Sequence, residues 1–403
     1  MTVGSERPVG VIGAGLVGLA TAWQIAKAGR PVVVFDKEAG VAAHQSGHNS
    51  GVVHSGIYYT PGSAKARMCR RGVELLRDYC SDKALPWDAR GKLIVARDDD
   101  ETVRLRELQR RADANGVPDV QWLDREGIVA LEPEVAGVAA LLSPTTAIVD
   151  YPAIARSLAD DVRSMGGQVL TATPVVGIRP AAESVDVQTP AGTHRLLRLV
   201  ICGGLQSDQL ARLAGADDGP EIVPFRGEYL RLRAHARDRV RRMIYPVPDP
   251  AYPFLGVHLT PRLDGSSDLG PNAVLALARE GYRRTDVSGA HLATLARSTA
   301  FRHLARTHWR AGAHEMRGSL SRRAFVAEAR TYLPWLTLAD VEAGPTGVRA
   351  QAVDADGSLV DDFRIQTRGP VVAVRNAPSP AATACLAIAE HIAAETLPAG
   401  SQR

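Results

Sequence analysis

The sequence predicts an α/β plus α+β protein, in which a Rossmann-like dinucleotide-binding domain is joined to a discontinuous second domain built on an antiparallel or mixed sheet. Three glycines near the start of the chain, Gly13, Gly15 and Gly18, form the Gly-x-Gly-x-x-Gly fingerprint that indicates the first domain. Short apolar runs over 222–277, separated by Pro, Gly and Asp, indicate an antiparallel meander in the second. A later apolar run at 199–204 ends in two glycines and indicates a return to the first domain.

The glycine fingerprint lies between an apolar strand at 9–12 and a helix that we expect over 16–28. Gly13 permits a tight turn, Gly15 lets the backbone approach a phosphate, and Gly18 lets the helix pack closely on the strand. The start of the helix adds free N–H groups and the positive end of the helix dipole. Together these features predict a pyrophosphate site at this turn.

A second apolar run at 32–35 supports the same interpretation, because it ends in Asp36. Dinucleotide-binding folds place an acid about 20 residues after the glycines, where it holds a ribose hydroxyl. An ordinary βαβ unit with a glycine-rich turn would explain the small residues but not this acid. The fingerprint therefore predicts a dinucleotide, and it does not separate FAD from NAD.

Composition limits the partners of the chain. Its 403 residues favour two or more domains, and 45% hydrophobic with 23% charged residues is ordinary for a globular protein. The net charge is +4, and the basic stretch 231–242 lacks interleaved aromatic residues, so we expect a solvated face and no nucleic-acid partner. The four cysteines have no Cys-x-x-Cys spacing, which disfavours a metal or redox-dithiol site.

The expected location is cytoplasmic. The N-terminus enters the first strand at once, without room for a signal peptide, and no apolar run reaches the ~18 residues of a membrane span. A peripheral contact with the inner face of the cell membrane is an alternative for the basic region 302–330, which contains Leu304, Trp309, Leu320 and Phe325. A packed surface helix explains the same region.

The chain is expected to alternate between its two domains. The dinucleotide-binding domain takes residues 1–86, 149–221 and 344–403, and the substrate domain takes residues 87–148 and 222–343. Further helices are expected over 63–80, 101–115, 151–166, much of 290–332 and a final stretch that ends near 395.

The loop 44–59 is the richest candidate for chemistry. It contains three histidines, three serines, three glycines and Asn49. Its histidines can act as bases near neutral pH, and its glycines allow the backbone to approach a flat ligand. For each single histidine, a hydrogen-bonded structural role is the alternative.

The fingerprint with Asp36 and the loop 44–59 resemble those of the L-2-hydroxyglutarate oxidase/dehydrogenase family, in the wider D-amino-acid-oxidase-like group. The resemblance covers nearly the whole chain in order. It implies FAD, a two-domain fold and oxidation of L-2-hydroxyglutarate to 2-oxoglutarate. The wider group usually has Glu where this chain has Asp36. The later motifs that carry the resemblance are 224–229 (PFRGEY), 244–250 (IYPVPDP), 254–260 (FLGVHLT), 270–273 (GPNA) and 347–351 (GVRAQ).

The resemblance and the chemistry together indicate a substrate site. Oxidation of a hydroxyl beside a carboxylate needs a base for the proton, flavin N5 for the hydride and cations for the carboxylates. Arg349 is the first candidate anchor, because related amino-acid oxidases use a similar Gly-Leu-Arg, and Arg226 is the second. Tyr245 and His258 are candidates for hydrogen bonds to a carboxylate or to the hydroxyl. His54 is the preferred base, as in related glycerol-phosphate-oxidising flavoproteins, and His258 is its rival.

The cofactor site is expected along several segments. The resemblance gives Val176 as the residue whose backbone holds the adenine, and it brings 376–382 to the flavin. There the first N–H groups of the final helix would stabilise negative charge on the reduced flavin. The expected FAD-binding residues are Gly13, Gly15, Leu16, Val17, Gly18, Asp36, Lys37, His44, Ser46, His48, Asn49, Ser50, Gly51, Val52, Val176, Gly203, Gly204, Ser379, Pro380 and Ala381.

Two other functions remain open on the sequence. The same fold could oxidise an amine, an amino acid or a larger secondary alcohol, and a flavin-binding sensor would bind the cofactor without turnover. The electron acceptor expected for the reduced flavin is oxygen or a quinone.

Overall fold

The computed structural model describes residues 7–216, 218–250 and 256–397. Its first sheet has six strands in the order β20-β21-β13-β1-β2-β9, with β20 antiparallel and the other pairs parallel. This sheet collects strands from distant parts of the chain. They are β1 (Val9–Ile12), β2 (Val32–Phe35), β9 (Gln168–Leu170), β13 (Arg198–Ile201), β20 (Arg364–Arg368) and β21 (Val371–Asn376).

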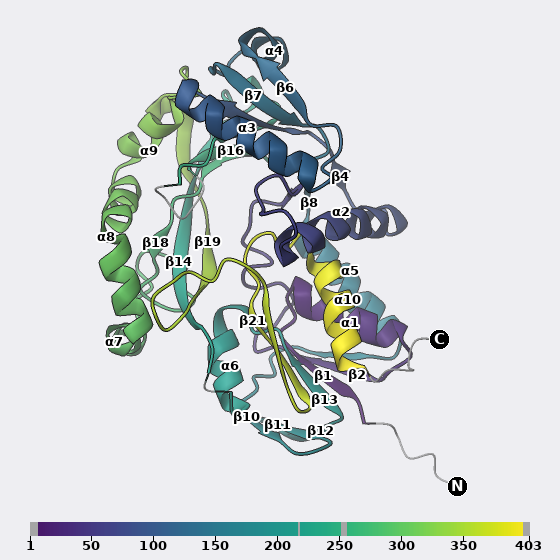
Figure 1. Cartoon of the computed structure of the whole chain (residues 1–403). Helices are drawn as coiled ribbons and strands as arrows, with labels where there is room; N and C mark the ends of the chain where they lie inside the picture. Colours follow the sequence, from purple (N-terminus) through teal and green to yellow (C-terminus); the bar gives the residue numbers. More distant parts are fainter. Residues whose placement is uncertain (1–6, 217, 251–255, 398–403) are drawn as a thin grey trace.

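Helices cover one face of the six-stranded sheet, and a small second sheet covers the other (Figure 1). The apolar sides of the helices form one core with the sheet, in which α1 contacts both α5 and α10. These helices are α1 (Leu16–Lys27), α2 (Ala64–Asp82), α5 (Tyr151–Ser164) and α10 (Cys385–Thr396). The small sheet packs on the opposite face and consists of β10 (Gly177–Pro180), β11 (Val185–Thr189) and β12 (Gly192–Leu196).

The second large sheet has nine strands in the order β18-β14-β17-β16-β15-β5-β7-β6, with β19 also paired to β14. All of its pairs are antiparallel except β5 with β15, so the sheet is mixed. The strands are β5 (Lys92–Ala96), β6 (Gln121–Asp124), β7 (Ala139–Ser143), β14 (Glu221–Leu232), β15 (Met243–Pro246), β16 (His258–Pro261), β17 (Ser267–Gly270), β18 (Val274–Leu275) and β19 (Val341–Val353).

Helices from both halves of the chain pack around this sheet, with α7, α8 and α9 along one side and α3 across its other end (Figure 1). Every one of α2 to α5 and α7 to α9 starts at an Asp or Ser N-cap whose side chain accepts a backbone N–H. The remaining elements are α3 (Asp99–Ala114), α4 (Arg125–Leu131), α6 (Ser207–Leu213), α7 (Gly289–Arg297), α8 (Thr299–Leu320), α9 (Arg322–Ala329), the short helices η1 (Gly204–Gln206), η2 (Arg237–Arg239) and η3 (Leu338–Asp340), and a third small sheet of β3 (Val52–Val53), β4 (Trp87–Asp88) and β8 (Ala147–Val149).

The structure differs from the sequence-based expectation mainly in the second sheet. Two strands were not expected, β17 and the long β19. The strand expected over 254–260 begins at His258, and residues 254 and 255 lie outside the described residues. The five-segment division into domains remains a proposal. Because β19 belongs to the nine-stranded sheet, we propose that the last segment of the dinucleotide-binding domain begins after 353 rather than at 344.

Within the described ranges, no helix combines the length and the apolar character that a membrane crossing requires.

The tightest backbone approach in the first domain lies at Gly18. A Cβ atom at this position would lie 1.9 Å from the carbonyl oxygen of Gly13, which is backbone and cannot rotate away. We therefore expect Gly18→Ala to push α1 away from β1 and to lower the free energy of unfolding by at least about 2 kcal/mol. Thermal unfolding of the two proteins measures this difference.

Gly40→Ala is the matched control, because a Cβ at Gly40 would meet no atom within 4 Å. An unfolding midpoint of Gly18→Ala equal to that of the control would contradict the close approach.

Candidate active site

A cavity of about 1100 Å³ runs between the six-stranded and the nine-stranded sheets. At one end it is lined by the turn between β1 and α1, and at the other by side chains of β14, β15, β16 and β19. The loop 42–54 and the segment 374–383 line it between these ends. A cavity of this size and length suits a dinucleotide together with a small substrate.

The turn between β1 and α1 forms a cradle that only glycine can build. Gly13 has a φ of +104°, and a Cβ there would lie 2.4 Å from the carbonyl oxygen of Cys202. A Cβ on Gly15 would meet only the Oγ atom of Ser46, at 3.0 Å. The N–H groups of Val17 and Gly18 lie in the first turn of α1, where no helical acceptor exists. This geometry fits the pyrophosphate of FAD.

Asp36 lies at the end of β2, and its carboxylate is already held by backbone. Its Oδ2 atom accepts a hydrogen bond of 2.6 Å from the N–H of Ala14, and Oδ1 accepts one of 2.8 Å from the N–H of Glu38. The carboxylate still lines the cavity. The side chain of Asp36 is therefore fixed in position where a ribose hydroxyl is expected, with lone pairs left for it.

The loop 42–54 is organised by its own polar side chains. The Oγ atom of Ser46 accepts the N–H of Leu16 at 2.9 Å, which ties the loop to the start of α1. Asn49 donates to the carbonyl oxygens of Gln45 and Ser46, and its Oδ1 atom accepts the N–H of Gly51. These bonds hold residues 42–51, most of which line the cavity, without regular strand structure before β3 begins at Val52.

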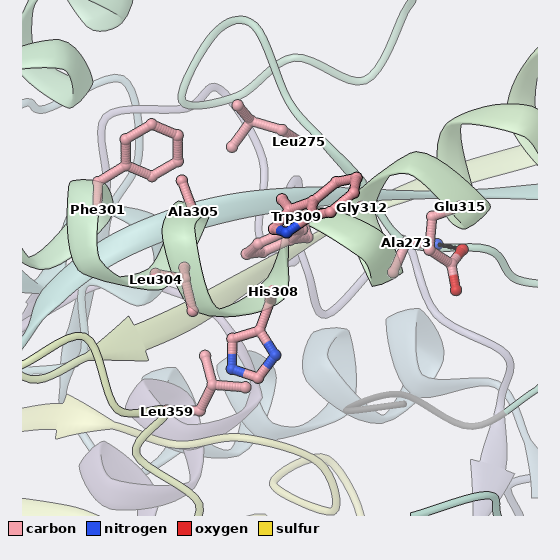
Figure 2. A pocket seen from close by; sticks show the side chains of 11 residues that line it. Ala273, Leu275, Phe301, Leu304, Ala305, His308, Trp309, Gly312, Glu315 and Leu359 are labelled. Carbon is pink, nitrogen blue, oxygen red and sulfur yellow. Dashed lines mark hydrogen bonds between the residues drawn. The ribbon is translucent and has the colours of Figure 1, made fainter. Parts of the chain in front are cut away.

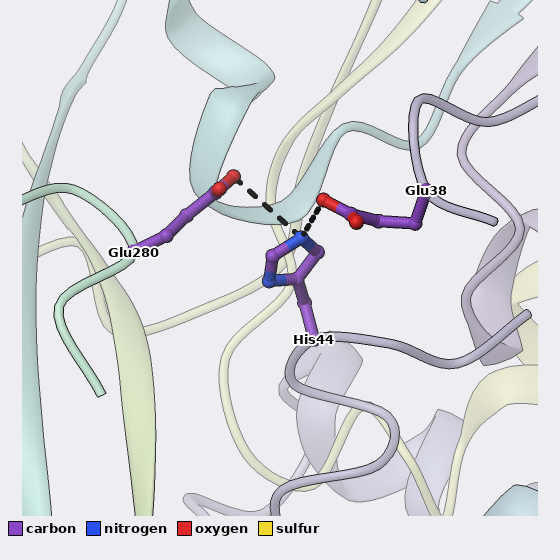
Figure 3. Close-up of side chains that lie close together, drawn as sticks. All are labelled: Glu38, His44 and Glu280. Atoms are coloured by element: carbon purple, nitrogen blue, oxygen red, sulfur yellow. Dashed lines mark hydrogen bonds and ion pairs between the residues drawn. The ribbon is translucent and has the colours of Figure 1, made fainter. Parts of the chain in front are cut away.

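The imidazole of His44 lies between the carboxylates of Glu38 and Glu280, as Figure 3 shows. The ligand atoms of these three residues lie within 4.8 Å of one another, a spacing that a metal ion could use. The ammonium of Lys37, however, contacts all three side chains, at 3.1 Å from His44 and 2.9 Å from Glu280. The lysine supplies the positive charge here, so we assign the cluster as a salt-bridge network at the rim of the cavity.

Most of the expected cofactor-binding residues line this cavity, and two do not. Gly51 lies beside it, where a Cβ would approach the carbonyl oxygen of Val149. Val176 has 58% of its surface exposed, and its N–H pairs with Gln188. The cavity is lined instead by residues 173–175, and we propose this neighbouring stretch for the adenine contact.

The segment that precedes α10 lines the cavity with Ser379, Pro380 and Ala381. The helix itself begins at Cys385, after the residues expected at its start. Consecutive turns, with hydrogen bonds from Ala381 to Pro378 and from Ala384 to Pro380, fill the gap. The N–H groups nearest the cavity therefore come from these turns and not from the first turn of the helix.

Two buried histidines face the other end of the cavity. The Nδ1 atom of His54 has no hydrogen-bond partner among the described residues, while its backbone N–H donates to the hydroxyl of Thr383 at 3.0 Å. The Nδ1 atom of His258 lies 2.9 Å from the carbonyl oxygen of Gly256, so Nδ1 carries the proton and Nε2 is left as an acceptor. Burial lowers the pKa of each imidazole to about 3. Both rings are therefore neutral at physiological pH, and each has one unprotonated ring nitrogen.

Tyr245 and Arg349 complete this end of the cavity. The ring of Tyr245 stacks on His258 with centroids 3.9 Å apart, and burial raises the pKa of its phenol, which stays protonated and can donate. Arg349 lies on β19 opposite Phe225 of β14 and lines the cavity. Its positive charge contributes to the low pKa of both histidines, which places the guanidinium near them. Four of the five expected substrate-site residues thus converge.

Arg226, the second expected anchor, does not line the cavity. Its guanidinium lies 3.1 Å from the carboxylate of Glu228 and donates to the carbonyl oxygen of Arg283. Successive side chains of a strand point to opposite faces, and Tyr229 is the side chain of this stretch that reaches the cavity. Arg226 is therefore directed away, into a buried ion pair.

Several residues of the site had not been expected from the sequence. Tyr58, Tyr59 and Tyr229 line the cavity, and Lys92 lies behind it, with 1% of its surface exposed. The signal for Lys92 was available: it is one of five lysines among 48 basic residues, and it begins the apolar run Lys-Leu-Ile-Val-Ala.

A second, smaller cavity of about 270 Å³ lies between α8 and the edge of the nine-stranded sheet (Figure 2). Its lining is mainly apolar, and the indole of Trp309 at its mouth is 62% exposed. Leu304 and Phe325 are buried, as a packed helix requires, and the side chain of Leu320 lies outside the described residues.

The sequence of this chain is similar to those of known proteins. The family model described as "FAD dependent oxidoreductase" (DAO) matches residues 8–395. The L-2-hydroxyglutarate dehydrogenase of Escherichia coli (strain K12) is 40% identical over 95% of this chain and 91% of its own length. The mitochondrial L-2-hydroxyglutarate dehydrogenases of Nematostella vectensis and Homo sapiens are 45% and 43% identical, over 96% and 97% of this chain and 89% of their own lengths.

Solved structures agree on the fold. The dithionite-reduced L-alpha-glycerophosphate oxidase from Mycoplasma pneumoniae with FAD bound has a TM-score of 0.79 at 24% identity, over 97% of this chain and 94% of that one. A glycine oxidase from Bacillus cereus has a TM-score of 0.70 at 16% identity, over 97% and 95%. The expected fold class and FAD as the cofactor are confirmed. The chain belongs to the FAD-dependent oxidoreductase family, and within it to the group of the L-2-hydroxyglutarate dehydrogenases.

Proposed function

We propose that this chain oxidises L-2-hydroxyglutarate to 2-oxoglutarate with FAD. The observation that carries the proposal is the meeting of His54, His258, Tyr245 and Arg349 at one end of the cavity whose other end is the glycine cradle. A base, a phenol and a guanidinium beside a dinucleotide site are what oxidation of a 2-hydroxy acid needs. An amine oxidase would use the same fold, but the relatives named for L-2-hydroxyglutarate match nearly the whole chain at 40% identity or more.

Bound FAD supplies the acceptor for the two electrons and the hydrogen that leave the hydroxyl-bearing carbon. Residues of the chain bind and orient the substrate and take up the proton. Arg349 binds the carboxylate next to that carbon with a guanidinium fork, and this contact orients the C–H bond. Tyr245 donates a hydrogen bond to the substrate. His54, whose imidazole lines the cavity, takes the hydroxyl proton.

The electron acceptor and the location remain proposals. We propose oxygen or a quinone as the acceptor and the cytoplasm as the location. The support for a peripheral membrane contact is now limited to the exposed Trp309 on the basic helix α8, because Leu304 and Phe325 pack inward.

The function is tested by anaerobic titration of the FAD-loaded protein with L-2-hydroxyglutarate. We expect full bleaching of the flavin absorbance and stoichiometric formation of 2-oxoglutarate. Glycine, sarcosine and D-2-hydroxyglutarate serve as comparison substrates, and reoxidation by air or by a soluble quinone then identifies the acceptor. Bleaching by an amine and not by the hydroxy acid would replace the proposal with amine oxidation, and no bleaching by any of them would support a sensor.

Arg349→Ala tests the carboxylate anchor. Removing a charged group that binds a buried carboxylate costs about 2–5 kcal/mol, so we expect the dissociation constant for the hydroxy acid to rise at least about 30-fold. Affinity for FAD should stay nearly unchanged, because the cradle lies at the other end of the cavity. Flavin reduction at varied substrate concentration and FAD release measured by fluorescence give the two constants.

Arg226→Ala is the matched comparison, since its guanidinium is held by Glu228 outside the cavity. We expect this variant to unfold at lower temperature while it keeps its substrate affinity. Equal losses of substrate and FAD affinity in Arg349→Ala would argue against the anchor.

His54→Ala tests the base. Loss of a general base slows proton transfer by ~10²–10⁴-fold, and we expect this slowing in the first-order rate of anaerobic flavin reduction at saturating substrate. His258→Ala, measured in parallel, should slow the reaction less, and His391→Ala on the surface of α10 is the control. If His258→Ala shows the larger loss, the base is the Nε2 atom of His258 instead.

A further inference from the structure

Lys92, at the start of β5, is buried directly behind the proposed substrate site. Its ammonium lies 4.5 Å from the ring centroid of Tyr58 and 5.2 Å from that of Tyr245. Both rings line the cavity, whereas Lys92 does not. The amine therefore supports the two phenol rings from the protein side.

No carboxylate of the described residues forms an ion pair with Lys92. Its neighbours across the sheet are Met243 on β15 and Ser143 on β7. The thiol of Cys69 on α2 is neutral, because burial raises its pKa to about 12, and burial likewise raises the pKa of the Tyr58 phenol. The other titratable groups near the amine are the phenol of Tyr245, whose pKa burial raises, and the imidazoles of His54 and His258.

An amine buried without a counter-anion costs stability, and methionine would fill a similar volume without that cost. A protein retains such a group where its function requires the charge. After burial, which is the largest cause, Lys92 and Arg349 both contribute to the low pKa of His54 and of His258, and no carboxylate of the described residues contributes to either shift. A bound dicarboxylate would supply the negative charge that Lys92 lacks among the described residues.

We propose that Lys92 is a positioning residue of this site, whose buried ammonium fixes the rings of Tyr58 and Tyr245 and supplies charge for binding a dicarboxylate. The inference rests on the proposed function, because it assigns the substrate class as doubly negative. The ring contacts are cation–π interactions, which gain strength where water is excluded. The long-range attraction adds to that of Arg349 and selects two carboxylates over one.

The charge of Lys92 depends on pH within an accessible range. Burial lowers the pKa of Lys92 to about 7, so the amine is charged below that pH and loses its proton above it. Affinity for a dicarboxylate should therefore fall as the pH rises through 7. The buried charge also lowers the free energy of unfolding. This loss is largest below the lowered pKa of Lys92, and it disappears as the pH approaches the ordinary lysine pKa of about 10.4.

The test compares Lys92→Met with the wild-type protein, both loaded with FAD, using glutarate as a dicarboxylate that has no hydroxyl to oxidise. Binding is followed by the change that glutarate causes in the flavin absorbance. At about pH 6 we expect the dissociation constant to rise roughly tenfold or more in Lys92→Met, and at about pH 9 the difference should shrink to less than about threefold. Butyrate, with one carboxylate, should lose less affinity. The unfolding midpoint of the variant at about pH 6 should equal or exceed that of the wild type.

Lys83→Met is the matched control, because Lys83 also lies over a tyrosine ring, that of Tyr79, but pairs with Asp161 far from the cavity. It should leave glutarate affinity unchanged at both pH values. Equal glutarate affinity in Lys92→Met and wild type, or a lower unfolding midpoint with no pH-dependent loss of affinity, would overturn the role of Lys92 and leave the proposed function intact. Wild-type protein that binds no glutarate and is not reduced by L-2-hydroxyglutarate would overturn the proposed function itself.

Discussion

We infer that the chemistry of this protein depends on one electrostatic constraint: Lys92 and Arg349 bring positive charge to the inner end of its cavity, and no carboxylate of the described residues forms an ion pair with Lys92. Lys92 and Arg349 both lower the pKa of His54 and His258, and no acid contributes in the opposite direction. Such an arrangement is unfavourable in the empty protein and favourable once an anion enters. We propose that this positive charge limits stability and favours an acidic substrate, while burial, helped by the same charge, keeps the two imidazoles neutral.

The constraint is met by residues that are far apart in the sequence. His54 comes from the loop after β3, Lys92 from β5, His258 from β16 and Arg349 from β19. The long antiparallel pairing of β14 with β19, from Glu221 opposite Val353 to Leu232 opposite Val341, fixes Arg349 in register. A rigid sheet thus positions the side chains that we propose for substrate binding, while the glycine cradle and its loop form the site that fits the cofactor.

The sequence predicted those elements correctly whose structure depends on residues close together in the chain. The strand, helix and second strand around Gly13, Gly15 and Gly18 lie within a residue of their expected bounds, because turn geometry and helix packing require those glycines. Sequence reasoning did not predict β19, because Gly344, Pro345 and Gly347 are unfavourable in a strand. The strand forms because it pairs with β14 along most of its length. The resemblance ranked Arg349 above Arg226 as an anchor, but sequence could not show that the guanidinium of Arg226 pairs with Glu228 outside the cavity.

The lysines show how structure separates a structural charge from a functional one. In this arginine-rich chain, Lys37, Lys65 and Lys92 all lie at or beside the cavity. Lys37 is held by Glu38 and Glu280, and Lys65 lies 2.7 Å from Asp361, so both charges are neutralised within the protein. Lys92 has no such partner among the described residues, and its ammonium lies 4.5 Å and 5.2 Å from the ring centroids of Tyr58 and Tyr245. Its charge is balanced only when a ligand supplies the anion, which is why we assign it to binding and not to folding.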